Sequence, residues 1–176
     1  MNRAAPPRIL LSAGEASGDL HGAGVVASLL AQRPDLAVEG CGGPRMAAAG
    51  LTVRCEVTQL GTMGFLEVVR AMPRHLRLLR QLIAEARAGR YAMAVLIDYP
   101  GFHMRLGTRL RAAGVPVLQY VAPQLWAWRS ERVQHLRGAA DRLAVILPFE
   151  EEWFASRGIP CTFVGHPLMD RSWPSQ

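Results

Sequence analysis

The sequence contains 176 residues, of which 50% are hydrophobic and 19% are charged. This composition is typical of a folded domain that buries a core, and it excludes a disordered chain. The formal charge is +6, and all 20 basic residues are arginine. Because arginine prefers phosphate and carboxylate partners, the charge favours an anionic substrate or an anionic membrane surface. No nucleic acid partner is expected, since the arginines are spread out and no aromatic stacking motif accompanies them.

Two further features limit where the protein acts. The three cysteines form no C-x-x-C motif, which predicts reduced thiols in a cytoplasmic protein. No apolar run approaches the ~18 residues of a membrane span, so any membrane contact is expected to be peripheral.

The chain opens with a short apolar strand that ends at Ala13 and Gly14, where a turn needs small residues. Ser17 and Asp19 are favourable N-cap residues for the helix that follows. A strand that feeds a helix through a tight turn is the first half of a βαβ unit, whose functional residues lie at the carboxyl end of the strand. Glu15 lies at that point.

The alternation of strand and helix continues along the whole chain. After the first strand, further strands are expected at residues 36–40, 51–55, 91–97, 115–121, 143–147 and 161–164. Later helices are expected at residues 46–49, 66–88, 104–113, 125–136 and 149–156. This alternation predicts an α/β fold with a doubly wound, mostly parallel, Rossmann-like sheet of about seven strands.

Two carboxylates follow strands that should be neighbours. In the usual strand order 3-2-1-4-5, a crevice forms at the carboxyl ends of the first and fourth strands. Glu15 follows the first strand and Asp98 the fourth, so we expect both in one cleft, beside the loop at residues 122–124. Asp98 is the stronger candidate for a general base because its strand is apolar throughout, although an Asx-turn is an alternative. Glu15 and Asp19 fit helix capping equally well.

The first helix offers a different interpretation. Its segment Gly22–Ala27 matches G-x-G-x-x-A, and Glu39 ends the second strand where a dinucleotide site places its ribose-binding acid. However, the glycines of a dinucleotide site form the turn directly after the first strand, whereas these lie inside the helix. A dinucleotide-binding Rossmann domain is therefore the minor alternative.

A tryptophan-rich segment follows the fifth expected strand. Trp126 and Trp128 are two positions apart, and such side chains point to different faces of a helix. One of them is therefore expected to be exposed or to line the cleft, with Tyr120 and Arg129 nearby. The alternative is that Trp126 belongs to the core and Trp128 is a partly covered surface residue.

The segment 65–80 has the pattern of a membrane-facing helix. Met72, Leu76 and Leu79 account for one apolar face. The apolar residues left over include Phe65, Leu66, Val68 and Val69, and Arg70, Arg74, Arg77 and Arg80 surround them. Apolar residues ringed by arginine predict shallow insertion into an anionic membrane surface. The alternative is a helix packed more deeply, which Pro73 could divide in two.

Seven segments spread over nearly the whole chain resemble the amino-terminal half of lipid-A-disaccharide synthase. They are Ser12–Asp19, Gly42–Met46, Met63–Glu67, Ile97–Phe102, Tyr120–Arg129, Leu147–Glu150 and Phe163–Pro167. The resemblance implies an inverting glycosyltransferase with the two-domain B-type fold. The implied reaction joins UDP-2,3-diacylglucosamine to 2,3-diacylglucosamine 1-phosphate, releases UDP and forms the β-1,6-linked lipid A disaccharide 1-phosphate. It also implies a peripheral location at the cytoplasmic face of the inner membrane, and neither a metal nor another cofactor.

The resemblance implies roles for individual residues. Asp98 is the base that would deprotonate the acceptor hydroxyl, and Glu15 would orient the acceptor or share the proton. Gly14, Ser17 and Gly18 would allow close approach to a helix N-terminus. The other expected substrate-binding residues are Asp19, Arg45, Met63, Gly64, Pro100, Phe102, Tyr120, Pro123, Trp126, Trp128 and Arg129, the last beside the 1-phosphate of the acceptor.

The chain departs from the family pattern in two ways. His103 stands where the family pattern leads us to expect asparagine, and the sequence ends at Gln176, whereas the family continues into a second, nucleotide-binding domain. We therefore expect residues 1–176 to form a single acceptor-side domain that is inactive alone. A catalytically silent fragment that binds lipid or membrane is the alternative.

Overall fold

The computed structural model of the chain describes residues 5–56, 65–128 and 130–169, without the side chains of 65–72, 128 and 130. Within these residues, seven strands form one parallel sheet in the order β3-β2-β1-β4-β5-β6-β7. The strands are β1 (Arg8–Ala13), β2 (Ala37–Gly42), β3 (Thr52–Glu56), β4 (Met93–Ile97), β5 (Val117–Tyr120), β6 (Arg142–Val145) and β7 (Cys161–Phe163). The predicted fold class and central strand order are confirmed.

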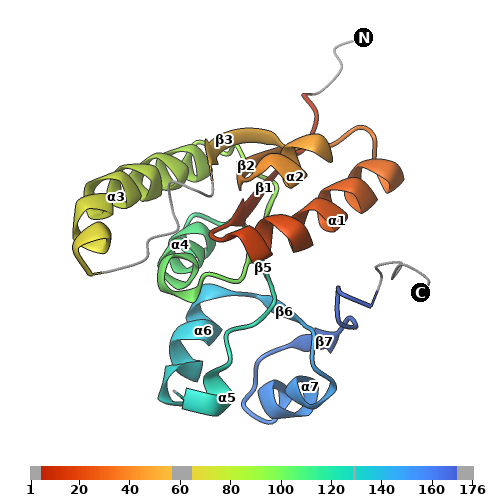
Figure 1. Cartoon of the computed structure of the whole chain (residues 1–176), viewed down its shortest axis with the longest axis vertical. Helices are drawn as coiled ribbons and strands as arrows, with labels where there is room; N and C mark the ends of the chain where they lie inside the picture. Colours follow the sequence, from red (N-terminus) through yellow and green to blue (C-terminus); the bar gives the residue numbers. More distant parts are fainter. Residues whose placement is uncertain (1–4, 57–64, 129, 170–176) are drawn as a thin grey trace, which may run out of the picture.

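Helices cover both faces of the sheet, as right-handed crossovers require when the strand order reverses. They are α1 (Ala16–Gln32), α2 (Pro44–Ala48), α3 (Phe65–Arg87), α4 (Pro100–Ala112), α5 (Leu125–Trp128), α6 (Val133–Ala139) and α7 (Pro148–Ala155). α1 and α2 lie on one side of the sheet, and α3, α4 and α6 lie on the other (Figure 1). None of the described helices combines the length and the apolar character that crossing a bilayer requires.

The core consists of two apolar clusters, one on each face of the sheet. Successive residues of a strand alternate between them: Leu10 and Leu96 belong to the cluster that includes α4 and α6, and Leu11 and Ile97 to the cluster that includes α1. The central strands are therefore buried on both faces. This burial explains why they are continuous apolar runs in the sequence.

Three helices differ from the sequence-based expectation. α4 begins earlier than expected, at Pro100, because proline at the first helical position has its φ already set. α3 continues through Pro73, which removes only one helical hydrogen bond, so the suggested division of this helix is wrong. The helix expected at 125–136 is divided into α5, a short 3-10 turn (Ser130–Arg132) and α6, in which Val133 and Leu136 are buried.

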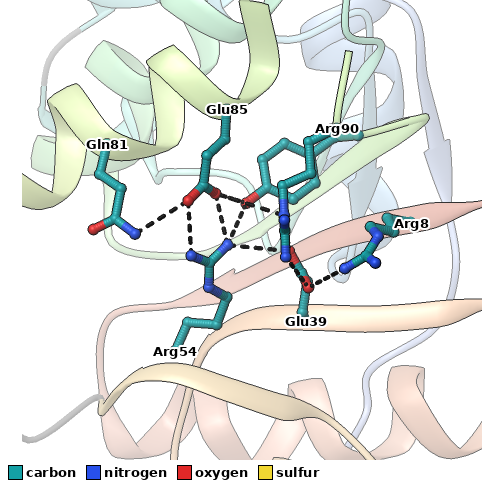
Figure 2. A network of polar contacts seen from close by, with 7 residues as sticks. Arg8, Glu39, Arg54, Gln81, Glu85 and Arg90 are labelled. Atoms are coloured by element: carbon teal, nitrogen blue, oxygen red, sulfur yellow. Dashed lines mark hydrogen bonds and ion pairs between the residues drawn. The ribbon is translucent and has the colours of Figure 1, made fainter. Parts of the chain in front are cut away.

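A network of ion pairs joins three strands to α3 at the amino edge of the sheet, where the strands begin (Figure 2). The Glu39 side chain in β2 is only 6% exposed and accepts hydrogen bonds from Arg8, Arg54 and Arg90 at 2.6 to 3.2 Å. Arg54 also donates to both carboxylate oxygens of Glu85 in α3, at 2.6 and 2.7 Å. The network therefore fixes the carboxyl-terminal half of α3 against the sheet.

These contacts determine the protonation of the two carboxylates. Hydrogen bonding by Arg90 holds the pKa of Glu39 below its ordinary value. Burial would raise the pKa of Glu85, but hydrogen bonds from Arg54 and Tyr91 outweigh burial and lower the pKa to about 2. Both carboxylates are therefore ionised at neutral pH.

The network also shows that the dinucleotide alternative is wrong. Glu39, the suggested ribose-binding acid, is occupied by three arginines at the amino edge, whereas nucleotides bind beyond the carboxyl ends of the strands. Gly22 and Gly24 lie inside α1 and form no turn. A Cβ atom on Gly22 would lie 2.6 Å from the Met46 sulfur, so this glycine allows α2 to pack on α1.

Candidate active site

The two predicted catalytic carboxylates come from neighbouring strands. Ala13 at the end of β1 pairs in register with Ile97 at the end of β4, so Glu15 and Asp98 follow at the same carboxyl edge of the sheet. Glu15 is exposed and Asp98 is half-buried. Burial, with the nearby charge of Glu15, raises the pKa of Tyr99, which places Glu15 close to the residue that follows Asp98.

Asp98 lies on a strained turn. Asp98 and Tyr99 have φ angles of 50° and 51°, and Val121 at the end of the neighbouring strand has a φ of 58°. Each such left-handed residue other than glycine costs about 1–3 kcal/mol and requires surrounding contacts that maintain it. Strain of this kind is concentrated at functional sites. The three left-handed residues therefore mark the carboxyl ends of β4 and β5 as the candidate site.

Buried side chains maintain this turn. The carbonyl oxygen of Asp98, turned inward, lies 2.6 Å from His103 Nδ1 and accepts a second hydrogen bond from Gln119 Nε2 at 3.3 Å. The other imidazole nitrogen, Nε2, lies 2.9 Å from Ser12 Oγ in β1. A buried chain of polar groups thus connects β1, the start of α4 and the loop that carries Asp98.

The protonation of His103 follows from its surroundings. Complete burial lowers the pKa of His103 to about 4, so the ring is neutral at pH 7. Because Nδ1 faces a carbonyl oxygen, it carries the hydrogen, and Nε2 accepts from the Ser12 hydroxyl. Sequence reasoning assigned no role to Ser12 or Gln119, and it noted His103 only as a departure from the family pattern. Polar residues inside otherwise apolar strands were the available signal for the first two.

The glycines of the first loop have packing roles. A Cβ atom on Gly14 would lie 2.0 Å from Tyr99 Cγ. The tyrosine ring therefore fills the space where close approach of a substrate was expected. A Cβ atom on Gly18 would lie 3.0 Å from the Ala13 Cβ, which brings α1 close to β1. The Tyr99 ring also stacks on His75 of α3, with 3.3 Å between its hydroxyl and His75 Nε2. Gly14 and Gly18 therefore shape the site without leaving space at their own positions.

The start of α1 corrects the predicted N-cap. The helix begins at Ala16 with Glu15 in the N-cap position and no side-chain cap, so Ser17 lies in the first turn and is exposed. The first backbone N–H groups of α1 have no helical partner, and the N-terminus of the helix carries the positive end of its dipole. An anionic group can bind there, beside Asp98.

Asp19 has a structural role. Its Oδ1 accepts hydrogen bonds from the backbone N–H groups of Gly43 and Met46 at 2.8 and 3.0 Å, and its Oδ2 accepts one from Arg45 at 3.1 Å. These donors belong to the start of α2, where helical N–H groups lack partners. We therefore reassign Asp19 from substrate binding to support of α2, on which the Arg45 side chain is exposed.

The remaining predicted residues divide into buried and accessible groups. Phe102, 7% exposed, packs against His75, Tyr99 and His103, so it supports the turn and does not face a ligand. Pro123 is likewise buried, whereas Pro100 and Tyr120 are half-buried at the carboxyl edge. Met63, Gly64 and Arg129 lie outside the described residues, as do the side chains of Trp128, Phe65, Leu66, Val68 and Val69.

Trp126 contacts the start of α7. Its indole N–H donates to Glu150 Oε1 at 3.1 Å, and its ring meets Phe149 edge to face at 4.9 Å between centroids. Glu150 is buried, whereas Phe149 is 50% exposed. The tryptophan is half-buried, and its place in the cleft stays a prediction.

A cavity of about 530 Å³ lies on the α1 side of the sheet, between α1, the strands β4, β5 and β6, and residues 164–168. His21, Tyr120 and Leu168 line it. Burial and the nearby His166 lower the pKa of His21, while the charge of Asp98 opposes this shift. In the described part of the chain, no three His, Cys, Asp or Glu side chains gather as metal ligands would.

Solved structures define the class of protein. A protein of Listeria monocytogenes described as a UDP-N-acetylglucosamine 2-epimerase matches with a TM-score of 0.65 at 11% identity, over 97% of this chain and 50% of that one. A UGT transferase of Siraitia grosvenorii, solved with UDP, matches with a TM-score of 0.56 at 11% identity, over 90% of this chain and 50% of that one. The class is the Rossmann-like half of a two-domain, B-type glycosyltransferase fold.

Sequence comparison identifies the family. The profile of the lipid-A-disaccharide synthetase family matches residues 9–176, and the chain belongs to this family. The lipid-A-disaccharide synthase of Myxococcus xanthus is 44% identical over 166 residues, which are 94% of this chain and 43% of that protein. That of Solibacter usitatus is 46% identical over 162 residues, 92% of this chain and 42% of that protein. The chain thus spans about two fifths of the length of these curated relatives.

Proposed function

We propose that this chain forms the acceptor-side domain of a lipid-A-disaccharide synthase. The observation that carries the proposal is the position of Asp98, half-buried on a strained turn beside the N-terminus of α1 at the carboxyl edge. The proposed reaction transfers 2,3-diacylglucosamine from UDP to 2,3-diacylglucosamine 1-phosphate. Its product is the β-1,6-linked lipid A disaccharide 1-phosphate.

In the proposed mechanism, Asp98 accepts the proton of the acceptor hydroxyl as its oxygen attacks the anomeric carbon of the donor. The attack comes from the face opposite the diphosphate, so the bond to UDP breaks and the configuration inverts. Glu15 orients the acceptor from the neighbouring strand. The N-terminus of α1, with Ser17 exposed in its first turn, stabilises an anionic group of a bound substrate.

The proposed substrates both carry acyl chains, which supports a peripheral position at the cytoplasmic face of the inner membrane. The segment with Phe65, Leu66, Val68 and Val69 is our proposed apolar contact with an anionic membrane. A lipid-facing entrance would spare the acyl chains a full transfer into water. The second domain, which the family resemblance implies, would supply most of the UDP contacts.

A chimera tests the proposal. Residues 1–169 of this chain would be joined to the carboxyl-terminal part of the Myxococcus xanthus relative, and disaccharide formation from the two proposed substrates would be measured. We expect product from the chimera and none from the 176-residue chain. The isolated chain should still bind 2,3-diacylglucosamine 1-phosphate in detergent. A chain that does not bind this lipid, together with an inactive chimera, would exclude the proposed role.

A further inference from the structure

A long trough lies over α4 on the side of the sheet away from α1. α4 lies between α3 and α6 (Figure 1), and two cavities of about 630 and 410 Å³ adjoin along it, since Leu79 and Arg109 line both. We call this feature the α4 trough. Its arginines are Arg80, Arg87, Arg105, Arg109 and Arg132, and His135 also lines it.

Among the described residues, the α4 trough is lined by basic side chains without an acid. No Asp or Glu is among the described residues that line either cavity. Arg105, Arg109 and Arg132 are exposed, and none of them forms an ion pair with a described acid. Arg54, in contrast, pairs with Glu39 and Glu85. Guanidinium groups bind phosphate with several N–H donors at once. The trough is therefore suited to a ligand with a phosphate group.

The α4 trough also has an apolar floor. Leu76 is 39% exposed, and Leu79, Ile83 and Met104 are half-buried along the same surface. An inorganic anion or a sugar phosphate would leave this floor in water. An acyl chain lying on it would bury apolar surface, which is favourable in proportion to the area removed from water.

The α4 trough extends along α4 away from the proposed base. The trough begins at Pro100 and Gly101, just after Asp98, and follows α4 to Arg109. Nine helical residues span on the order of 14 Å. The Arg109 end of the trough therefore lies well along α4 from the turn that carries Asp98.

We propose that the α4 trough binds an anionic phospholipid of the membrane. The lipid phosphate lies among Arg105, Arg109 and Arg132, and one acyl chain lies along Leu76, Leu79 and Met104. The inference rests on the proposed membrane location. It adds a specific lipid site to that location, separate from the apolar segment at residues 65–69.

The test uses the 176-residue chain and sedimentation with vesicles of phosphatidylcholine alone or mixed with phosphatidylglycerol. The combined variant Arg105→Gln/Arg109→Gln/Arg132→Gln should bind the mixed vesicles about tenfold or more weakly. The matched control Arg137→Gln/Arg142→Gln/Arg157→Gln removes the same charge from exposed positions elsewhere, and we expect a change of less than about twofold. Equal losses in both variants would mean diffuse electrostatic attraction and would overturn the site.

Two further measurements separate the sources of phosphate. Leu76→Ser should weaken vesicle binding and leave the melting temperature unchanged, because this side chain is already exposed. Soluble short-chain phosphatidylglycerol should compete with vesicles, and inorganic phosphate at the same concentration should not. Equal competition by inorganic phosphate would assign the trough to free anions. Neither measurement requires UDP-sugar. If the chimera were inactive but vesicle binding still depended on the trough arginines, the transferase proposal would be rejected and the lipid site would stand.

Discussion

The imidazole of His103 connects two strands of the candidate site, with its Nδ1 2.6 Å from the carbonyl oxygen of Asp98 and its Nε2 2.9 Å from Ser12 Oγ. The first contact stabilises a left-handed residue whose side chain is the proposed base. The second contact connects that turn to β1, and Glu15 follows shortly after the end of this strand. His103 touches no proposed substrate, so we regard it as a positioning residue.

Replacing His103 with leucine should remove both contacts and leave the buried Ser12 hydroxyl without its partner. An unsatisfied buried polar group costs ~1–3 kcal/mol, which corresponds to a fall in Tm of roughly 3–10 °C for a chain of this size. In the active chimera, kcat should fall more than KM rises, since the turn holds the base. Thermal unfolding and steady-state kinetics would measure the two effects.

His103→Asn is the matched control, because asparagine is the residue expected here from the family pattern. Its amide can donate to the Asp98 carbonyl, so it should retain more activity than His103→Leu. If both variants lost stability but kept wild-type kcat, His103 would only support the fold.

Burial of neutral His103 should make stability depend on pH. Its pKa is about 4 in the folded protein and 6.5 for the free side chain. Above pH 6.5 both states are neutral, so the full stability is present. Between pH 6.5 and pH 4 the unfolded chain binds a proton that the folded chain excludes, and the free energy of unfolding should fall by about 3 kcal/mol.

Urea unfolding at several pH values would measure this slope, and His103→Asn should remove it. The carboxylate network acts in a separate range. Because the pKa of Glu85 is lowered from 4.5 to about 2, its contribution is complete above pH 4.5 and is lost as the pH falls towards 2. An unchanged slope between pH 6.5 and 4 in His103→Asn would refute the assigned origin.

The Glu39 network at the amino edge should matter for stability alone (Figure 2). Glu39→Gln leaves Arg8, Arg54 and Arg90 without their shared carboxylate, which is only 6% exposed. Removing one member of a buried ion pair costs about 3–5 kcal/mol, and we expect about 2–3 here because the arginines are partly exposed to solvent. Chemical denaturation would measure the loss.

Asp35→Asn is the comparison, because it breaks the exposed pair between Arg33 and Asp35 at 2.7 Å. Water screens exposed pairs, which contribute little to stability, so the stability of this variant should be close to that of the wild type. Similar losses for Asp35→Asn and Glu39→Gln would contradict the structural importance of the network.

The sheet was predictable from the sequence because its strands are apolar on both faces and are separated by helices. The meeting of Glu15 and Asp98 at one edge followed from strand order alone. The supporting contacts were not predictable, because they join residues far apart in the chain. Asp19 caps α2, and the Tyr99 ring fills the space at Gly14. Sequence patterns locate turns and caps, but they do not show which distant group completes them.

The last prediction concerns the proposed base itself. Asp98→Asn removes the acid but suits the backbone, because asparagine tolerates the left-handed conformation observed here, with φ at 50°. The turn and its contact with His103 should therefore persist, and the Tm should change little. In the chimera, disaccharide formation should fall about 10²- to 10⁴-fold, while the isolated variant still binds the lipid acceptor. Glu15→Gln, which alters an exposed carboxylate at the N-cap of α1, should have the smaller effect. If Glu15→Gln were the more damaging change, the two roles would have to be exchanged. Near-normal turnover by Asp98→Asn would show that Asp98 is not the base.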